Sequence, residues 1–202
     1  MREIDTHFPA EACPFCGIAA AYPHPSSPPP SLWKKQDEKE MSLEDIVPDG
    51  DVQPERTQPG SFVVLAGRGV VAFLDILPMV GGHLLVATRN HRVKVSDMTS
   101  DEAQEMGFYL PLLSRVVSKV TNVSDWNIVQ NNGARAAQVV PHVHFHIIPR
   151  PATKPEIKSR SWTMFGRGQR DELDEEEGAR VAGEMRRCLR EEIKRAKGVS
   201  KL

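Results

Sequence analysis

Short apolar runs rich in β-branched residues recur between residues 61 and 149 and are separated by turn residues. Gly67–Gly69 divides two such runs and predicts a hairpin, while Pro78 and Gly81 mark the turn before the next run. Runs of this length and composition are typical of strands. The pattern therefore predicts five strands, at residues 61–67, 70–76, 83–88, 126–132 and 140–149.

Two longer segments have apolar residues at helical spacing. In residues 98–123, Thr99 and Glu102 have the spacing of a capping box, and Pro111 is expected to remove an intrahelical hydrogen bond or bend the axis. Residues 170–198 run from acidic to basic, which matches the helix dipole, and carry an apolar stripe at every fourth position: Val181, Met185, Leu189 and Ile193. Strands joined by short turns, with helices grouped elsewhere, indicate an antiparallel α+β domain.

The chain divides into four parts by composition. Residues 23–60 contain half of the 16 prolines and a cluster of acidic residues. Such a stretch gains too little apolar burial to offset ordering entropy, and it is predicted to be a flexible insert. The insert separates a short N-terminal segment, 1–22, from the compact core, 61–152. Residues 153–202 are a C-terminal extension whose amphipathic helix is expected to pack on its own domain.

Charge and cysteine content narrow the class of protein. The formal net charge of −1 over 202 residues provides no basic field for nucleic acid, so no nucleic-acid partner is expected. No apolar run approaches the roughly 20 residues of a membrane helix, and no membrane association is expected. Three cysteines cannot form a disulfide framework. A reducing location, cytoplasmic or nuclear, is therefore expected.

The strongest chemical signal is the segment PHVHFHIIPR, residues 141–150. His142, His144 and His146 alternate with apolar residues, so a strand would place the three imidazoles on one face, roughly 6.5–7 Å apart. A neutral imidazole can attack an electrophile, and a protonated one can donate to a leaving group. The alternative is an ordinary strand with polar residues facing water, but none of the three positions is Lys, Glu or Thr.

This segment resembles the signature of the histidine triad (HIT) superfamily. Other residues match the nucleotide-binding, phosphoramidase-like branch of that family in their spacing: Asp75 eight residues before His83, and Asn131 and Gln138 eleven and four residues before the triad. The resemblance covers residues 13–18 and about 62–150. It implies an α+β HIT-like fold, with a five-stranded antiparallel sheet and packed helices, and a homodimer formed through the helix at 99–121 and the sheet edge.

The resemblance also implies roles for individual residues. His144 would attack the α-phosphorus of an AMP-type purine nucleotide and form a covalent nucleotidyl-histidine, which water then releases. His146 would donate a proton or stabilise the oxyanion, and Gln138 would bind the phosphate or position the nucleophile. Asp75 and Asn131 would hold the ribose, and Phe15, Phe73 and Ile76 would line the slot for the base. Ala137 and Val139 would form the phosphate loop, and His83 would support the site.

One loop departs from the family pattern. Where the family has Gly-Gln-Ser/Thr-Val before the triad, this chain has Ala137-Gln138-Val139-Val140. Val139 therefore lacks a hydroxyl that would donate to a phosphate oxygen. Arg135, in the same loop, is a candidate for electrostatic compensation.

Cys13 and Cys16 form a Cys-x-x-Cys pair, which by itself fits a redox pair, a metal site or an incidental pair. The redox interpretation is weak because no thioredoxin-like βαβ pattern surrounds the pair. Many HIT proteins begin with such a pair and bind zinc, and the resemblance maps the other two ligands to His91 and His142. A Cys2His2 set satisfies tetrahedral zinc, so the implied role is structural.

Three functions are compatible with these residues. The match favours a hydrolase of nucleoside 5′-phosphoramidates of the AMP-amine type. A dinucleoside polyphosphate hydrolase is the alternative enzyme, but that branch of the family carries Asn where this chain has Asp75 and Gln where it has Asn131. The third possibility is a non-catalytic, nucleotide-binding regulatory protein, whose insert and tail helix would dock a partner.

Overall fold

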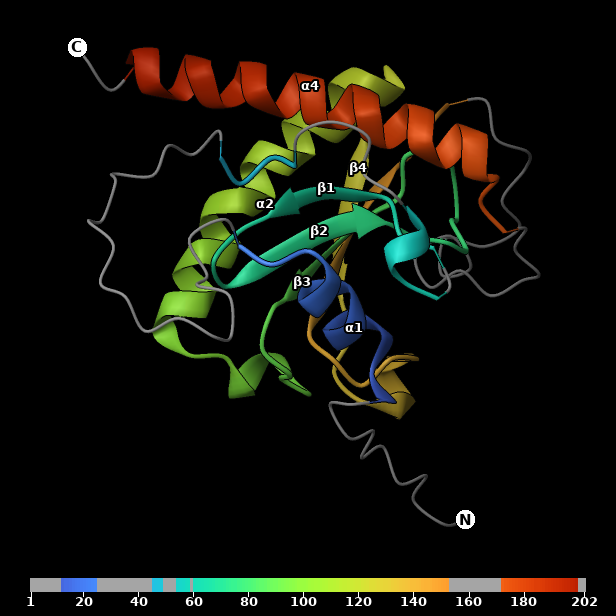
Figure 1. The fold of residues 1–202 in the computed structure, drawn as a ribbon, viewed down its shortest axis with the longest axis vertical. Helices are drawn as coiled ribbons and strands as arrows, with labels where there is room; N and C mark the ends of the chain where they lie inside the picture. Colours follow the sequence, from blue (N-terminus) through green and yellow to red (C-terminus); the bar gives the residue numbers. More distant parts are fainter. Residues whose placement is uncertain (1–11, 25–44, 49–53, 59, 153–171, 200–202) are drawn as a thin grey trace.

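Five strands form one antiparallel sheet in the computed structural model (Figure 1). The structure describes residues 12–24, 45–48, 54–58, 60–152 and 172–199. The strand order is β1-β2-β3-β5-β4, with the bounds β1 (Val63–Ala66), β2 (Val70–Leu74), β3 (Leu84–Thr88), β4 (Trp126–Gln130) and β5 (His144–Pro149). Each strand lies within one of the predicted runs, so the predicted α+β class is confirmed.

The last strand is shorter than predicted. β5 begins at His144, so His142 precedes the strand, and the prediction that all three histidines lie on one strand is wrong for His142. The cause is local hydrogen bonding. Val143 donates its N–H to the carbonyl of Arg92 (2.6 Å) and accepts from the N–H of Thr88 (3.1 Å). This part of the chain is therefore tied to the loop after β3 as well as to β3.

Helices cover both faces of the sheet (Figure 1). α1 (Pro14–Ala21) packs on one face against one set of alternating strand residues, and α2 (Ser100–Thr121) and α4 (Glu175–Val199) pack on the opposite face against the other set. β1 carries a bulge between Val63 and Leu65. The bulge bends the strand where its side chains pass from one apolar layer to the other. Two apolar layers therefore hold the sheet, and among the described helices only α1 packs on the face that carries His144 and His146.

α2 begins as the sequence predicts. The Thr99 hydroxyl accepts from the N–H of Glu102 (3.3 Å), and the Glu102 carboxylate accepts from the N–H of Thr99 (2.9 Å). The helix then continues through Pro111 without interruption. Proline has no N–H, so one intrahelical hydrogen bond is missing there, but burial of the apolar face keeps the helix intact.

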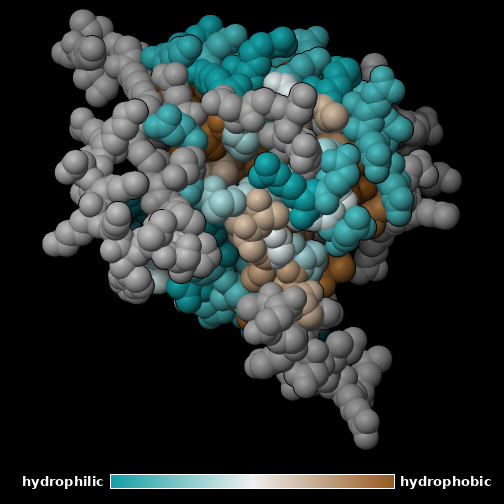
Figure 2. Space-filling view, viewed as in Figure 1, coloured by the Kyte–Doolittle hydropathy of each residue, from teal (hydrophilic) through white to brown (hydrophobic). Residues whose placement is uncertain are grey.

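α4 buries its predicted stripe against α2 and β1, and the expectation that it packs on its own domain is confirmed. Glu192, on the same helix, is 5% exposed and accepts hydrogen bonds from Arg115 (2.9 Å) and Lys119 of α2. The outer surface of the helix is polar, as the upper part of Figure 2 shows. Among the described residues, no helix has the length and apolar character needed to cross a bilayer.

Residues 45–48 and 54–58 of the 23–60 segment lie within the described residues, and both stretches contact the domain. Ile46 and Val47 are 3% and 2% exposed, and the carbonyl of Ile46 accepts from the N–H of Ala66 at the edge of β1 (2.8 Å). Residues 54–58 form a turn that includes the 3₁₀ helix η2 (Pro54–Arg56). The prediction of a flexible insert did not anticipate these contacts; residues 25–44, 49–53 and 59 of that segment lie outside the described residues.

Candidate functional site

A cleft of about 680 Å³ opens on the α1 face of the sheet. α1 forms one wall, and the end of β2 and the loop before β5 form others. The cleft brings together ten of the predicted site residues: Cys13, Phe15, Phe73, Asp75, Ile76, Asn131, Ala137, Val139, His144 and His146. The other five predicted site residues are not among the described residues that line the cleft: Cys16, His83, His91, Gln138 and His142.

His144 has one ring nitrogen fixed and the other available. Its Nδ1 lies 2.6 Å from the carbonyl oxygen of His142, and because a carbonyl only accepts, Nδ1 carries the proton. The Nε2 lone pair is therefore unprotonated. The ring is 5% exposed and lies edge-on to the ring of Phe15, with centroids 5.0 Å apart. Burial lowers the pKa of His144, so the neutral, nucleophilic form is favoured.

His146 is the end of a chain of three side chains. Its Nδ1 lies 3.0 Å from Nε2 of His83, and Nδ1 of His83 lies 3.2 Å from a carboxylate oxygen of Asp75 and 3.2 Å from the N–H of Met79. When His83 accepts from Met79, or is protonated and paired with Asp75, its Nε2–H donates to His146. His146 then keeps its own proton on Nε2, as a proton donor requires.

Gln138 is buried, and both ends of its amide bind backbone. Its Oε1 accepts from the N–H of Gly133 (2.6 Å), and its Nε2 donates to the carbonyls of Val93 (2.7 Å) and His142 (3.4 Å). The His142 carbonyl is the group that orients His144. This geometry favours the positioning role over direct contact with a phosphate.

The loop before β5 has unusual backbone geometry. Ala137 adopts a left-handed conformation (φ 62°), which is strained for a residue with a Cβ. Asn131 donates weakly to the carbonyl of Ala137 (3.5 Å), and Val139 is 88% exposed at the mouth of the cleft. Arg135 is exposed on the 3₁₀ helix η4 (Ala134–Ala136) and is not among the described residues that line the cleft.

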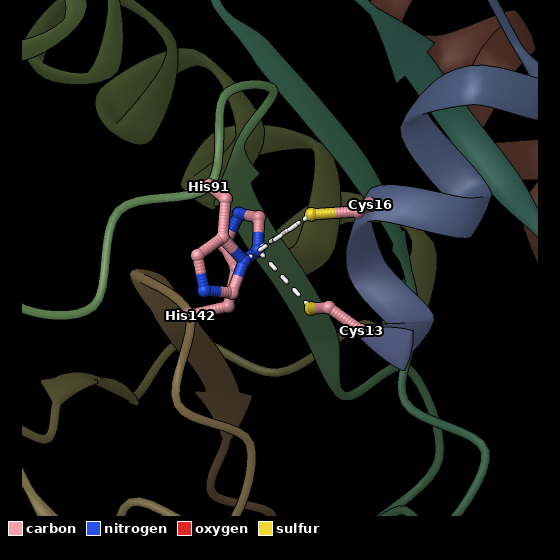
Figure 3. Close-up of side chains that lie close together, drawn as sticks. All are labelled: Cys13, Cys16, His91 and His142. Carbon is pink, nitrogen blue, oxygen red and sulfur yellow. Dashed lines mark hydrogen bonds between the residues drawn. The ribbon is translucent and has the colours of Figure 1, made fainter. Parts of the chain in front are cut away.

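The predicted metal ligands converge beside the cleft (Figure 3). Sγ of Cys13 and Sγ of Cys16 lie 3.4 and 3.5 Å from Nδ1 of His142, and Sγ of Cys16 lies 3.3 Å from Nδ1 of His91. All four ligand atoms lie within 4.8 Å of one another. Tetrahedral zinc with ordinary bond lengths would separate sulfur and nitrogen ligands by about 3.6 Å. The four residues form a cluster that can hold a metal ion.

The surroundings of His142 also fit a metal ligand. Its Nε2 lies 2.7 Å from the carbonyl of Thr88, so Nε2 carries the proton and Nδ1 presents a lone pair to the two sulfurs. The ring is fully buried, and burial lowers the pKa of His142 to about 4. A neutral imidazole with a second hydrogen bond of this kind is the usual form of a metal-ligating histidine.

The sequence interpretation missed one wall of the cleft. Arg56, Thr57, Gln58, Gly60 and Ser61 also line it, and most of them belong to the segment predicted to be a flexible insert. Nothing in their composition distinguishes them from the rest of that segment, because a turn bounded by Pro and Gly has the same sequence pattern whether or not it lines a cleft.

Comparison with known proteins identifies the family and the fold. The model of the HIT domain matches residues 56–153. An adenosine 5′-monophosphoramidase of Schizosaccharomyces pombe is 42% identical over 81 residues, 40% of this chain and 58% of that protein. An uncharacterised HIT-like protein of Methanocaldococcus jannaschii is 38% identical over 113 residues, 56% of this chain and 83% of that protein.

Other matches include a different activity and a solved structure. An asymmetrical bis(5′-nucleosyl)-tetraphosphatase of S. pombe is 35% identical over 91 residues, 45% of this chain and 50% of that protein. The matches to the two named S. pombe enzymes thus span little more than half of each enzyme. The zinc-bound histidine triad family protein of Mycobacterium smegmatis has a TM-score of 0.58 and 20% identity, covering 91% of this chain and 96% of that one, and it shows the same fold.

Proposed function

Because this chain belongs to the HIT family, we propose that it hydrolyses nucleoside 5′-phosphoramidates of the AMP-amine type through a nucleotidyl-histidine on His144. The observation that carries the proposal is the orientation of the His144 ring. Its Nδ1–H is held by the His142 carbonyl, so the Nε2 lone pair is the only nucleophilic position on the ring.

The cleft gives each part of such a substrate a complementary environment. The base packs in the apolar slot beside Phe15 and Phe73, whose rings lie 5.2 Å apart, and the ribose hydroxyls bind Asp75 and Asn131. Nε2 of His144 attacks the α-phosphorus and the P–N bond breaks. The leaving amine takes its proton from Nε2 of His146. Water then cleaves the histidine–phosphorus bond and releases AMP.

The cofactor in this proposal is one structural zinc ion held by Cys13, Cys16, His91 and His142. Four protein ligands leave no open position, so the ion would cross-link α1, the loop after β3 and the start of the triad rather than act on the substrate. The same cross-link would fix the His142 carbonyl that orients His144.

Two observations favour phosphoramidates over dinucleoside polyphosphates. Asp75 and Asn131 stand where the polyphosphate hydrolases of the family carry Asn and Gln. Of the two S. pombe relatives, the one named as a phosphoramidase shares more identity with this chain than the one named as a tetraphosphatase, 42% against 35%. Hydrolysis of a phosphoramidate and of a dinucleoside polyphosphate is therefore to be measured side by side.

The test compares the wild type with His144→Ala, using adenosine 5′-phosphoramidate and diadenosine tetraphosphate as substrates and chromatography of the products. We expect AMP to form faster from the phosphoramidate, and His144→Ala to lose at least about 1,000-fold in rate while still binding AMP. His24→Gln, a matched histidine substitution outside the cleft, serves as the control, with folding of each variant checked by circular dichroism. Full turnover by His144→Ala would contradict the proposal, and AMP binding without turnover in the wild type would favour a regulatory protein.

A further inference from the structure

One end of the cleft is closed by residues 54–58, 60 and 61, here called the Arg56 turn. In Figure 1 its 3₁₀ helix (cyan) lies next to the arrowhead of β2. The turn is internally braced, because the Pro54 carbonyl accepts from the N–H groups of both Thr57 (3.3 Å) and Ser61 (3.2 Å). The Thr57 hydroxyl also donates to the Ser61 hydroxyl (2.9 Å). These hydrogen bonds give the Arg56 turn a defined conformation.

The register of the sheet places the end of the Arg56 turn beside Asp75 and Ile76. Val63 pairs with Phe73, and the carbonyl of Phe62 accepts from the N–H of Leu74 (3.1 Å). In an antiparallel pair, the residues before Phe62 therefore run beside those after Leu74, which are Asp75 and Ile76. The Arg56 turn thus lines the cleft next to Asp75 and Ile76, the residues proposed to hold the ribose and to line the base slot.

The same turn also contacts Tyr22, which follows α1 and is not among the described residues that line the cleft. The guanidinium of Arg56 lies over the Tyr22 ring, 5.6 Å from its centroid, and Tyr22 is 5% exposed. Stacking on a buried ring limits the positions that the arginine can take. Within the part of the chain that the structure describes, Arg56 forms no ion pair with a carboxylate, so the N–H donors of its guanidinium can bind a ligand.

From this arrangement, which rests on the proposed function, we propose that the Arg56 turn recognises the edge of the bound base and selects guanine nucleotides over adenine nucleotides. The guanidinium offers only donors, and guanine presents two adjacent acceptors, O6 and N7, that match its fork. Adenine presents an amino group beside N7, which sets a donor against a donor. The exposed amide of Gln58 lies on the same wall and provides both an acceptor and a donor for the rest of that edge.

The test measures the affinities of GMP and AMP by isothermal titration calorimetry, because neither monophosphate is turned over. We expect the wild type to bind GMP at least about fivefold more tightly than AMP, from the ~1–3 kcal/mol that a bidentate arginine–guanine contact contributes. Arg56→Ala should reduce this ratio to below about twofold while AMP affinity changes little, and Arg56→Lys should restore only part of it, since ammonium lacks the fork. Arg68→Ala, at an exposed arginine outside the cleft, is the matched control and should keep the full preference.

The outcomes separate this inference from the proposed function. Equal affinities in the wild type, or a guanine preference that survives Arg56→Ala, overturns the role of the Arg56 turn but leaves His144-dependent hydrolysis standing. A chain that binds neither monophosphate overturns both. Loss of the preference in Arg56→Ala with retention in Arg68→Ala supports the proposal.

Discussion

Val139 is the residue whose chemistry departs most from that of a phosphate loop. It is 88% exposed at the mouth of the cleft, in a position where a hydroxyl would donate to a phosphate oxygen. Restoring the hydroxyl with Val139→Ser should therefore strengthen the interaction with a transferring phosphoryl group. A charge-assisted hydrogen bond contributes about 1.5–3 kcal/mol, so we expect kcat/KM for adenosine 5′-phosphoramidate to rise roughly 10-fold or more.

The control for this gain is Val139→Ala, which removes the bulk of valine without adding a donor. If Val139→Ala accelerates the reaction as much as Val139→Ser, steric relief explains the gain and the hydrogen bond does not. Arg135→Ala addresses the compensation hypothesis separately. Because Arg135 lies outside the described lining of the cleft, we expect unchanged kinetics for that variant.

Glu102 makes the domain sensitive to acid. Burial alone would raise the pKa of its carboxyl, but hydrogen bonds from Asn90, the Thr99 N–H and Arg92 outweigh burial and lower that pKa from 4.5 to about 2. A depressed folded-state pKa gives stability that is fully present above about pH 4.5 and is lost as pH falls toward 2. Urea unfolding at pH 7 should show Glu102→Gln destabilised by about 1–3 kcal/mol, with the difference from wild type shrinking below pH 4.5.

Asp101→Asn is the matched control, because Asp101 is exposed in the same helical turn. It should change stability by less than about 0.5 kcal/mol at either pH. A Glu102→Gln variant whose deficit stays constant from pH 7 to pH 3 would show that shape, rather than charge, carries the effect.

At the scale of elements, α1 is the helix that most needs an anchor. It has only eight residues, its N-cap side chain makes no capping hydrogen bond, and among the described helices it is the one that covers the cleft face of the sheet. Isolated helices of this length are unstable in water, so its position depends on tertiary contacts. Arg89 supplies one, by donating to the carbonyls of Ala19 and Tyr22 at its C-terminal end. The Cys13–Cys16–His91–His142 cluster supplies the other at its N-terminal end.

The double variant Cys13→Ser, Cys16→Ser tests that anchor. We expect zinc content to fall from about one ion per chain to below ~0.2, and hydrogen exchange in residues 14–21 to accelerate at least about 10-fold, because α1 loses its N-terminal attachment. Cys188→Ser, at the remaining cysteine, should retain its zinc and its protection. Wild-type protein that carries under ~0.2 zinc per chain after careful purification would rule out the structural zinc.

Elements with a strong local pattern were predictable, and their ends were not. The α4 stripe and the Thr99–Glu102 capping box follow from side-chain spacing alone, and both are confirmed. The start of β5 depends on Val143, which binds Arg92 about fifty positions earlier. Such a non-local contact leaves no trace in the alternation that predicted the strand. His142 consequently lies against Cys13 and Cys16 and is not among the described residues that line the cleft.

At the scale of the whole molecule, sequence spacing located most of the cleft because its residues lie on the sheet and on the loops that join its strands. Phe73 and Asp75 follow from the resemblance to the HIT family pattern around His83, and His144 from the triad. The Arg56 turn was not predictable in this way. Its place in the cleft is set by the bulged pairing of β1 with β2 and by contacts with Tyr22, none of which alters local composition.

The two edges of the sheet differ in a way that bears on assembly. The β1 edge is covered, since Ala66 donates to Ile46 and the carbonyl of Val63 accepts from Arg186 of α4 (2.9 Å). β4 forms the other edge, and its residues Trp126 and Ile128 are 39% and 46% exposed. Among the described residues, no strand pairs with the outer edge of β4, and an edge strand with large exposed apolar side chains favours pairing with another chain.

The register of β4 indicates how a second copy would pair there. Ile128 lies opposite Ile147, whose side chain packs toward α2, so Ile128 faces the α2 side of the sheet, while Val129 lines the cleft. Antiparallel pairing of two β4 strands would extend the sheet across a twofold axis and bury Ile128 from both chains.

We therefore expect a homodimer, with twice the mass of one chain in size-exclusion chromatography with light scattering. Ile128→Lys should shift it to monomer at micromolar concentration, because a charge would be buried at the centre of the interface. Glu191→Lys, at an exposed position on α4, should leave the dimer intact. A dimer that persists in Ile128→Lys would place the interface elsewhere, and a monomeric wild type would mean that the exposed β4 edge does not pair in solution.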